Sequence, residues 1–148
     1  MAKNSESKNL LNVEIVSPEG IIFEGEASSV TLPTVQGEIT VLPHHVNLFT
    51  KLGRGIAIVT SGSKEQTFAI MGGFLEITSG TLRIISDFAI SAEDISSAQA
   101  EEAKKRAERA KREADANVDF VEIEKDLQRS ILQLDVAGKM KRKRSRVD

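Results

Sequence analysis

Residues 11–34 read LNVEIVSPEGIIFEGEASSVTLPT, and this stretch decides the class of the fold. Its β-branched residues come in short alternating runs, as at Val13 and Ile15, and the runs are interrupted at Pro18 and Gly20. Alternation with a period of two gives a strand one face toward a core and one toward solvent, while proline and glycine mark turns. The stretch therefore predicts short β-strands joined by tight turns.

The same pattern continues as far as residue 90, with a turn signal about every eight to twelve residues. The later signals lie at residues 53–55, 61–63, 72–73 and 79–80. This spacing is typical of antiparallel sandwiches and barrels, whereas alternating strands and helices need longer intervals. We therefore expect residues 9–90 to form a β-sandwich domain of roughly eight to ten strands.

The composition changes after residue 90. Residues 91–116 read SAEDISSAQAEEAKKRAERAKREADA, which is rich in the strong helix formers alanine, glutamate, lysine and arginine and contains no proline or glycine. Ser91, followed three residues later by Asp94, resembles a capping box, which is a start signal of helices. A helix is therefore expected to begin at Ser91.

A second helix is expected from about residue 120, because Asp119 and Glu122 repeat this start signal. Residues 117–118 would form a link of the length that joins antiparallel helices. Each helix carries one stripe of apolar residues spaced three or four apart. The stripes consist of Ala103, Ala107, Ala110 and Ala114 on the first helix and of Phe120, Ile123, Leu127, Ile131 and Leu134 on the second. We therefore predict an antiparallel two-helix hairpin over residues 91–137, which makes the fold class α+β.

The seam of this hairpin is built partly from alanines, which bury little apolar surface. We therefore expect the hairpin to depend on partners and to be able to leave the β domain. A plain, permanent hairpin would show the same pattern of residues.

The two ends of the chain are expected to lie outside the folded domains. Residues 1–8 are polar, and we predict that they are disordered. Residues 138–148 are predicted to be a basic, flexible tail, because the run KMKRKRSR at residues 139–146 has six basic residues in eight. Such a run binds phosphates or acidic protein surfaces, or it is simply a solvated end of the chain.

Composition and motifs exclude most enzyme classes. The chain has no cysteine for disulfides or thiolate chemistry, and no apolar run approaches the roughly 18 residues that span a bilayer. Neither G-x-S-x-G nor the phosphate-binding G-x-x-x-x-G-K-[ST] occurs. The only two histidines, His44 and His45, have Glu38 as their one nearby carboxylate, which is too few ligands for a metal. We therefore expect no catalytic, metal-binding or cofactor-binding site.

Several motifs in the right order resemble the epsilon subunit of the F-type ATP synthase. The family pattern GEIxVLPxHxxLxTxLxxG is matched by Gly37, Glu38, Leu42, Pro43, His45, Leu48, Thr50, Leu52 and Gly55. The S-P-E-G turn at residues 17–20, GGFLEI at 72–77, LRIISD at 82–87 and AEDI at 92–95 match as well. His44 stands where the family commonly has a small residue. The likeness extends over nearly the whole chain.

This resemblance implies a rotor subunit with no active site of its own. The implied partners are the gamma shaft, the membrane ring of c subunits and, through the C-terminal helices, the catalytic alpha and beta subunits of a proton-translocating synthase. The chain would couple the shaft to the ring and restrain ATP hydrolysis. It would be a peripheral protein at the cytoplasmic face of the cell membrane, as part of the complex.

The resemblance also implies two groups of contact residues. The loop region that meets the rotor ring would contain Gly37, Glu38, Pro43 and His45. The contacts that restrain the catalytic head, where family members face acidic segments of the beta subunits, would come from Arg129, Lys139, Lys141, Arg142, Lys143, Arg144 and Arg146. The first group lies in the predicted β domain and the second in the second helix and the tail.

Some members of the family bind ATP in the folded hairpin through an I-D-x-x-R-A motif. The matching residues 95–100 read ISSAQA, so that Ser96 replaces the aspartate and Gln99 the arginine. Gln133 stands one turn after Arg129, where a second arginine would help. Arginine pairs with phosphate through two parallel donors, which glutamine cannot imitate. The resemblance therefore implies a hairpin that is not an ATP sensor.

A nucleic-acid-binding adaptor is the alternative function. The basic run at residues 139–146 would then bind phosphates, and binding would weaken steeply with salt. Residues 1–90 do not favour such a partner, because they contain nine acidic and six basic residues. The run would have to carry the binding alone, so the rotor subunit, with no nucleic-acid partner, is preferred.

Overall fold

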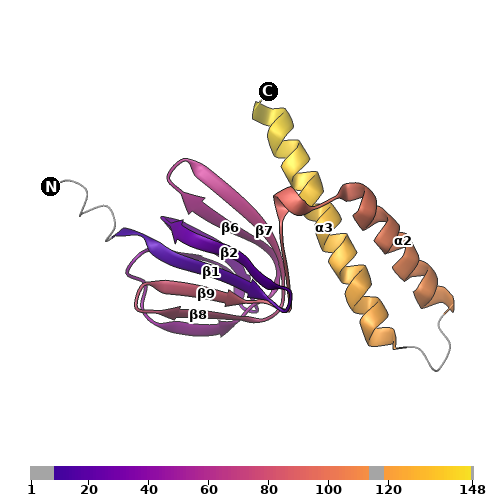
Figure 1. Cartoon of the computed structure of the whole chain (residues 1–148), viewed down its shortest axis with the longest axis horizontal. Helices are drawn as coiled ribbons and strands as arrows, with labels where there is room; N and C mark the ends of the chain where they lie inside the picture. Colours follow the sequence, from indigo (N-terminus) through magenta and orange to yellow (C-terminus); the bar gives the residue numbers. More distant parts are fainter. Residues whose placement is uncertain (1–8, 114–118, 148) are drawn as a thin grey trace. The chain divides into compact units, whose positions relative to one another are not determined.

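Two five-stranded sheets form a sandwich in the first part of the chain (Figure 1). The computed structural model describes residues 9–113 and 119–147, so the predicted disordered segment 1–8 and the predicted link at 117–118 lie outside the described residues. The strands are β1 (Leu11–Ser17), β2 (Gly20–Ala27), β3 (Ser29–Thr34), β4 (Gly37–Val41), β5 (Leu48–Lys51), β6 (Arg54–Ser61), β7 (Lys64–Met71), β8 (Phe74–Thr78), β9 (Thr81–Ile85) and β10 (Phe88–Ser91). The predicted β-sandwich is confirmed.

The strand order is β2-β1-β9-β8-β5 in one sheet, here sheet A, and β10-β7-β6-β3-β4 in the other, here sheet B. The predicted turns at residues 61–63, 72–73 and 79–80 join consecutive strands from β6 to β9. All paired strands are antiparallel except β1 and β9, which run parallel. The parallel pair was not predicted, because alternation within a strand says nothing about the direction of its partner.

Alternate residues of both sheets form one apolar core. Its fully buried side chains include Leu11, Ile15, Leu32, Phe68, Ile70, Leu75, Leu82 and Ile84. Burial of one such side chain contributes about 1.5–3 kcal/mol, so the core is the main source of stability for the sandwich. Because the inward residues fix the register of every strand, the outward residues are held in fixed rows.

The chain crosses between the sheets five times, and two of these crossings, β7–β8 and β9–β10, meet in one corner. The buried Ser86 hydroxyl lies 2.6 Å from the carbonyl oxygen of Phe88 and 3.0 Å from that of Gly72. The backbone N–H of Phe88 donates to the same hydroxyl at 3.3 Å. Gly73 has a φ of +99°, and a Cβ atom at this position would lie 2.0 Å from the carbonyl oxygen of Ile85. Only glycine allows this close approach of two backbone segments.

The chain divides after Ser91 into two compact units, here the β unit and the helical unit. The helical unit contains a 3₁₀ helix, η2 (Ala92–Asp94), and the helices α2 (Ser97–Glu113) and α3 (Phe120–Val147). The predicted helix start at Ser91 was wrong, because Ser91 ends β10 and the N–H of Gln99 donates to the Ser96 hydroxyl at 3.4 Å. The second predicted start is confirmed, since Asp119 Oδ1 accepts a hydrogen bond from the N–H of Val121 at 3.0 Å.

The two helices pack through part of the predicted seam. Ala107 and Leu127 are buried, but Phe120 is 51% exposed, so its predicted place in the seam was wrong. Leu132 and Val136 are also buried, although they lie on another side of α3. Five residues separate Leu127 from Leu132, which turns the helix by about 140°. α3 therefore carries apolar residues on two sides, whereas the sequence pattern predicted one stripe.

α3 continues through residues 138–147, for which a flexible tail was predicted. Lysine, arginine and methionine are good helix formers, and no proline follows Gly138. The side-chain Nε of Arg142 donates to the carbonyl oxygen of Gly138 at 3.3 Å, one turn earlier. The basic run therefore forms the last turns of a helix, where positive charge is favourable next to the negative end of the helix dipole.

We predict that Gly73→Ala lowers the free energy of unfolding of the β unit by at least about 3 kcal/mol, because the added methyl group collides with backbone atoms. Gly80→Ala is the matched control: Gly80 also has a positive φ, +82°, but no heavy atom lies within 4 Å of its added Cβ position. The control carries only the conformational cost, about 1 kcal/mol. Urea denaturation measures both variants, and equal stabilities would contradict the close approach at Gly73.

Candidate functional site

The structure divides the four predicted ring-contact residues between the two ends of the sandwich. Gly37 and Glu38 begin β4, whereas Pro43 and His45 follow its last residue, Val41. The five residues of β4 extend over about 14 Å. The four residues therefore do not share one loop, as the sequence suggested, but lie in a turn and in a loop at opposite ends of one strand.

The turn before β4 is held by a side chain. The Thr34 hydroxyl donates to the carbonyl oxygen of Gly37 at 2.6 Å and accepts from the N–H of Gln36 at 3.2 Å. Gly37 has a φ of +124°, which favours glycine. Val35, at the tip, is 57% exposed, and Glu38 is exposed beside it. The turn therefore presents an apolar side chain and a carboxylate on a fixed backbone.

The loop after β4 holds both histidines. His44 has a φ of +66°, in the left-handed region that histidine adopts more readily than most non-glycine residues. His44 Nε2 lies 3.3 Å from Asn9 Oδ1, and His45 Nδ1 donates to the carbonyl oxygen of Val46 at 2.6 Å. Among the described residues, no group of three or more histidine, aspartate or glutamate side chains is arranged to hold a metal ion.

The outer face of sheet A carries three rows of side chains that were not predicted. The strand registers place one residue from each of the five strands side by side in two of these rows, and one from each strand except β5 in the third. The apolar row consists of Phe74, Ile85, Val16 and Ile21, with Lys51 at its end. The charged row consists of Phe49, Glu76, Arg83, Glu14 and Glu24. The polar row consists of Thr78, Thr81, Asn12 and Glu26. The rows cannot be recognised in the sequence of any single strand, because a strand contributes at most one residue to each row.

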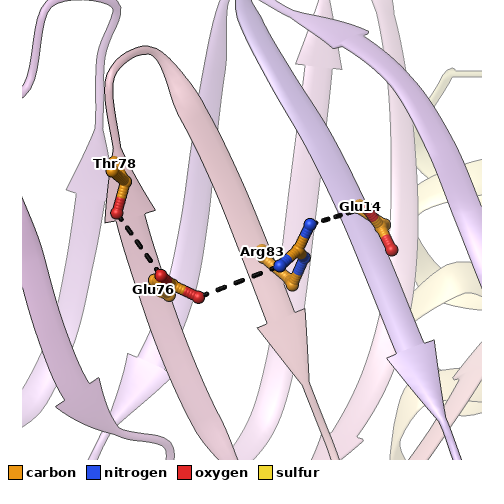
Figure 2. A network of polar contacts seen from close by, with 4 residues as sticks. All are labelled: Glu14, Glu76, Thr78 and Arg83. Atoms are coloured by element: carbon orange, nitrogen blue, oxygen red, sulfur yellow. Dashed lines mark hydrogen bonds and ion pairs between the residues drawn. The ribbon is translucent and has the colours of Figure 1, made fainter.

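Figure 2 shows the centre of the charged row. Arg83 lies 3.5 Å from Glu14 and 4.0 Å from Glu76, and the Thr78 hydroxyl donates to Glu76 at 3.5 Å. These side chains are partly exposed, and such ion pairs contribute about 0–1 kcal/mol. The network therefore orients the carboxylates more than it stabilises the sheet.

A groove of about 490 Å³ lies between α2 and α3. It is lined by Ala103, Arg106, Ala107, Ala110, Ile123, Asp126, Arg129, Ser130 and Gln133. Arg129 Nη1 lies 3.7 Å from Asp126 Oδ1, so one of the two arginines already faces a carboxylate. The groove thus brings together Arg129 and Gln133, around which ATP binding was considered, and adds Arg106, whereas Ser96 and Gln99 are not among its lining residues.

An exposed ion pair joins the two helices next to this groove. Lys111 Nζ donates to Glu124 Oε2 at 2.9 Å, and Gln128 Nε2 donates to Glu124 Oε1 at 3.1 Å. The hydrogen bond from Lys111, followed by that from Gln128, holds the pKa of Glu124 below its ordinary value. The carboxylate therefore stays charged and links α2 to α3.

The predicted inhibitory residues fall into two places on α3. Arg129 lies in the groove, whereas the remaining six are exposed in the last turns: Lys139, Lys141, Arg142, Lys143, Arg144 and Arg146. From Arg129 to Lys139 the helix rises by about 15 Å. These six residues, here the basic end of α3, form a separate surface.

Two family models match the chain in succession. The β-sandwich domain of the ATP synthase delta/epsilon chain matches residues 10–92, and the long α-helix domain of the same chain matches residues 93–138. The chain belongs to the ATP synthase delta/epsilon family. It is an epsilon-type subunit of an ATP synthase, without a catalytic role, in a complex of ATP synthesis and ion transport.

Relatives of this family are similar over almost their full length. The ATP synthase epsilon chain of Endomicrobium trichonymphae is 36% identical over 136 residues, which cover 92% of this chain and 99% of the relative. That of Hydrogenovibrio crunogenus is 38% identical over 131 residues, covering 88% and 91%. The epsilon chain of Halalkalibacterium halodurans is 36% identical over 130 residues, covering 87% and 98%.

Solved structures share the fold at lower identity. A chain of the Euglena gracilis mitochondrial ATP synthase, solved as OSCP/F1/c-ring, has a TM-score of 0.61 and 20% identity, covering 90% of this chain and 80% of that one. A chain of the central stalk and c-ring of the Tetrahymena thermophila mitochondrial enzyme has a TM-score of 0.52 and 13% identity, covering 86% and 96%. The complex is membrane-associated; within residues 9–113 and 119–147, no helix is long and apolar enough to cross a membrane.

We predict that the isolated epsilon-type chain does not bind MgATP with a dissociation constant below about 1 mM. The groove has Gln133 where another arginine would help and contains Asp126, which repels phosphate. Loss of one charge-assisted phosphate contact costs about 1.5–3 kcal/mol, a tenfold to hundredfold weakening. Titration calorimetry measures the affinity.

Gln133→Arg should tighten any residual binding at least about tenfold, whereas Gln128→Arg, outside the groove lining, should not. Micromolar binding by the unmodified chain would contradict the prediction.

Proposed function

We propose that this subunit couples the gamma shaft to the ring of c subunits in a proton-translocating ATP synthase and restrains ATP hydrolysis through its C-terminal helices. The observation that carries the proposal is the match of both family domains, in order, over residues 10–138. The subunit then lies at the cytoplasmic face of the cell membrane, where gamma and the ring hold it. A nucleic-acid adaptor receives no support from this match.

The β unit provides the coupling surfaces in this proposal. We assign the ring contact to the turn that carries Gly37 and Glu38, because its backbone is fixed by Thr34 and its tip exposes Val35. The loop with Pro43 and His45 lies at the opposite end of β4 and forms a second contact. A rigid sandwich with contacts on more than one side suits the transmission of torque between two partners.

The basic end of α3 provides the restraint. Its six cations are exposed on a helix and can approach acidic segments of the catalytic beta subunits. Surface charges act over about 10 Å at 0.1 M salt, so the attraction requires the basic end to be brought close to the head. A hairpin with two populations, one near the head and one away from it, would switch the restraint on and off.

We predict that the β unit is sufficient for assembly. A chain that ends near Ser91 keeps the complete core and both contact regions at the ends of β4, since the compact division of the chain falls after this residue. It should co-purify with the other synthase subunits and support coupled ATP synthesis in membrane vesicles. Loss of assembly in this truncation, while the intact chain assembles, would show that the helices are needed for docking.

We predict that removal of residues 139–148 raises ATP hydrolysis by the isolated complex. The increase should be larger at low salt, because salt screens the attraction that the intact basic end provides. A variant with glutamine at the six basic positions keeps the helix and should show the same increase. Glutamine at Lys104, Lys105 and Arg109 on α2 is the matched control and should leave hydrolysis unchanged. Unchanged hydrolysis after removal of the basic end, at every ionic strength, would refute the restraint.

A further inference from the structure

The last turns of α3 concentrate positive charge. Residues 136–147 contain the six cations of the basic end and no acidic residue. Cations three or four positions apart are neighbours on a helix and repel each other. Five pairs have this spacing: Lys139–Arg142, Lys139–Lys143, Lys141–Arg144, Arg142–Arg146 and Lys143–Arg146. An anion that binds to such a pair therefore also relieves repulsion within the helix.

One of these pairs, Lys141 and Arg144, lines a cavity of about 320 Å³. The cavity lies inside the helical unit, between the end of α3 and the residues from Ala92 to Ser97, which lead into α2. The other four cations of the basic end are not among its lining residues. Their spacing places them together on another side of α3. The structure thus separates two of the six cations from the rest.

The cavity has an apolar wall and a polar rim. The wall consists of four half-buried residues, Ala92, Ile95, Ala137 and Met140. The rim consists of four exposed residues, Glu93, Ser97, Lys141 and Arg144. An apolar wall keeps water away from one side of a bound ion, so charges at the rim act on it more strongly than they would in open solvent.

The groups at the rim match a phosphate group. The Arg144 guanidinium presents parallel N–H donors that fit two phosphate oxygens, and Lys141 adds a point charge. The Ser97 hydroxyl is a third donor. Glu93 is the one carboxylate of the lining, and the two cations outweigh its charge. Small-molecule sites have volumes of about 300–1,000 Å³, so this cavity suits a phosphate group with a small substituent and not a nucleotide.

We propose that this cavity binds a phosphate group, either as inorganic phosphate or as the head of a small phosphomonoester. Lys141 and Arg144 are its cationic ligands, and Ser97 is its hydrogen-bond donor. The site shares no lining residue with the groove around Arg106 and Arg129. A bound phosphate group links the end of α3 to the start of α2, and so holds the hairpin together at the end opposite its turn. The proposal does not depend on the coupling or restraint proposed above.

Titration of the isotope-labelled full-length chain with inorganic phosphate, followed by NMR, tests the site. Sodium chloride is adjusted to keep the ionic strength constant, which separates binding from screening. The amide signals of Ile95, Ser97 and Arg144 should shift and saturate, with a dissociation constant of about 1–10 mM. A parallel titration with glycerol phosphate, which is a phosphomonoester, shows which form of the phosphate group the cavity prefers.

Paired variants assign the binding to the cavity. Lys141→Gln/Arg144→Gln should weaken binding at least about tenfold, because both charged ligands are lost. The matched control Lys139→Gln/Arg146→Gln removes the same charge from the same turns and should stay within about twofold of the unmodified chain, because distant surface charges are screened.

A third variant, Ser97→Glu, places a carboxylate in the cavity and should abolish the saturable shifts. An acidic residue in the first turn of α2 also favours this helix, so the variant is expected to keep its fold. Equal helix content of all variants by circular dichroism is the control for folding.

The outcomes are distinct. Saturation with only one of the two compounds supports the site and identifies the source of the phosphate group. Lack of saturable shifts with both compounds in the unmodified chain overturns the proposal. Equal weakening by the two double variants shows that phosphate responds only to the total charge of the basic end, and this result overturns the cavity as well.

Discussion

The parallel contact between β1 and β9 holds the rest of the β unit in place. The hairpins β1–β2 and β8–β9 form between residues close in the sequence, but β1 and β9 join segments about 70 residues apart. Without this contact, sheet A would separate into a two-stranded and a three-stranded ribbon, and isolated ribbons of this size are marginal in water. The entropy of closing so long a loop is offset only when both sheets bury their inner faces together. The sandwich is therefore expected to form as one cooperative unit.

The same contact makes the outer face of sheet A continuous. It brings Glu14 beside Arg83 and Val16 beside Ile85, and so continues both rows from one hairpin to the other. The register shift between Ile15 and Val16 then aligns Ile21 with the apolar row. A slip of one residue would turn these side chains into the core, where their carboxylates could not be accommodated. The register of β1 against β9 thus determines both the burial of the core and the order of side chains on the outer face of sheet A.

The sequence was sufficient to predict local features of the fold. Period-two alternation predicted the strands, glycine predicted the turns, and Asp119 predicted the start of α3, because each signal acts within a few residues. The predicted start of α2 was wrong because it also relied on a local signal. Ser91 has a suitable acidic residue three positions later, but Ser91 belongs to β10 and pairs within sheet B. Tertiary pairing overrode a local helix signal.

Features that depend on distant segments could not be predicted. The rows of sheet A join residues from five strands, and β1 and β9 pair in parallel without any local turn to reveal it. The family resemblance assigned the ring-contact residues by motif, but a motif that runs through a whole strand necessarily has residues at both ends of it. The sequence did not reveal the backbone conformation of His44, whose φ of +66° depends on the whole loop after β4.

The two units differ in the forces available to hold them. The core of the β unit contains many fully buried leucine, isoleucine and phenylalanine side chains, whereas the seam between α2 and α3 relies on the buried Ala107 and Leu127 and on the exposed Lys111–Glu124 pair. An alanine methyl group contributes only about 0.8 kcal/mol when buried, and an exposed pair about 0–1 kcal/mol. The proposed restraint, in which the hairpin would have two populations, requires such a weakly held helical pair. In the proposed restraint, the cations of the basic end would attract acidic partners over a distance, whereas the apolar seam between the helices acts only in contact.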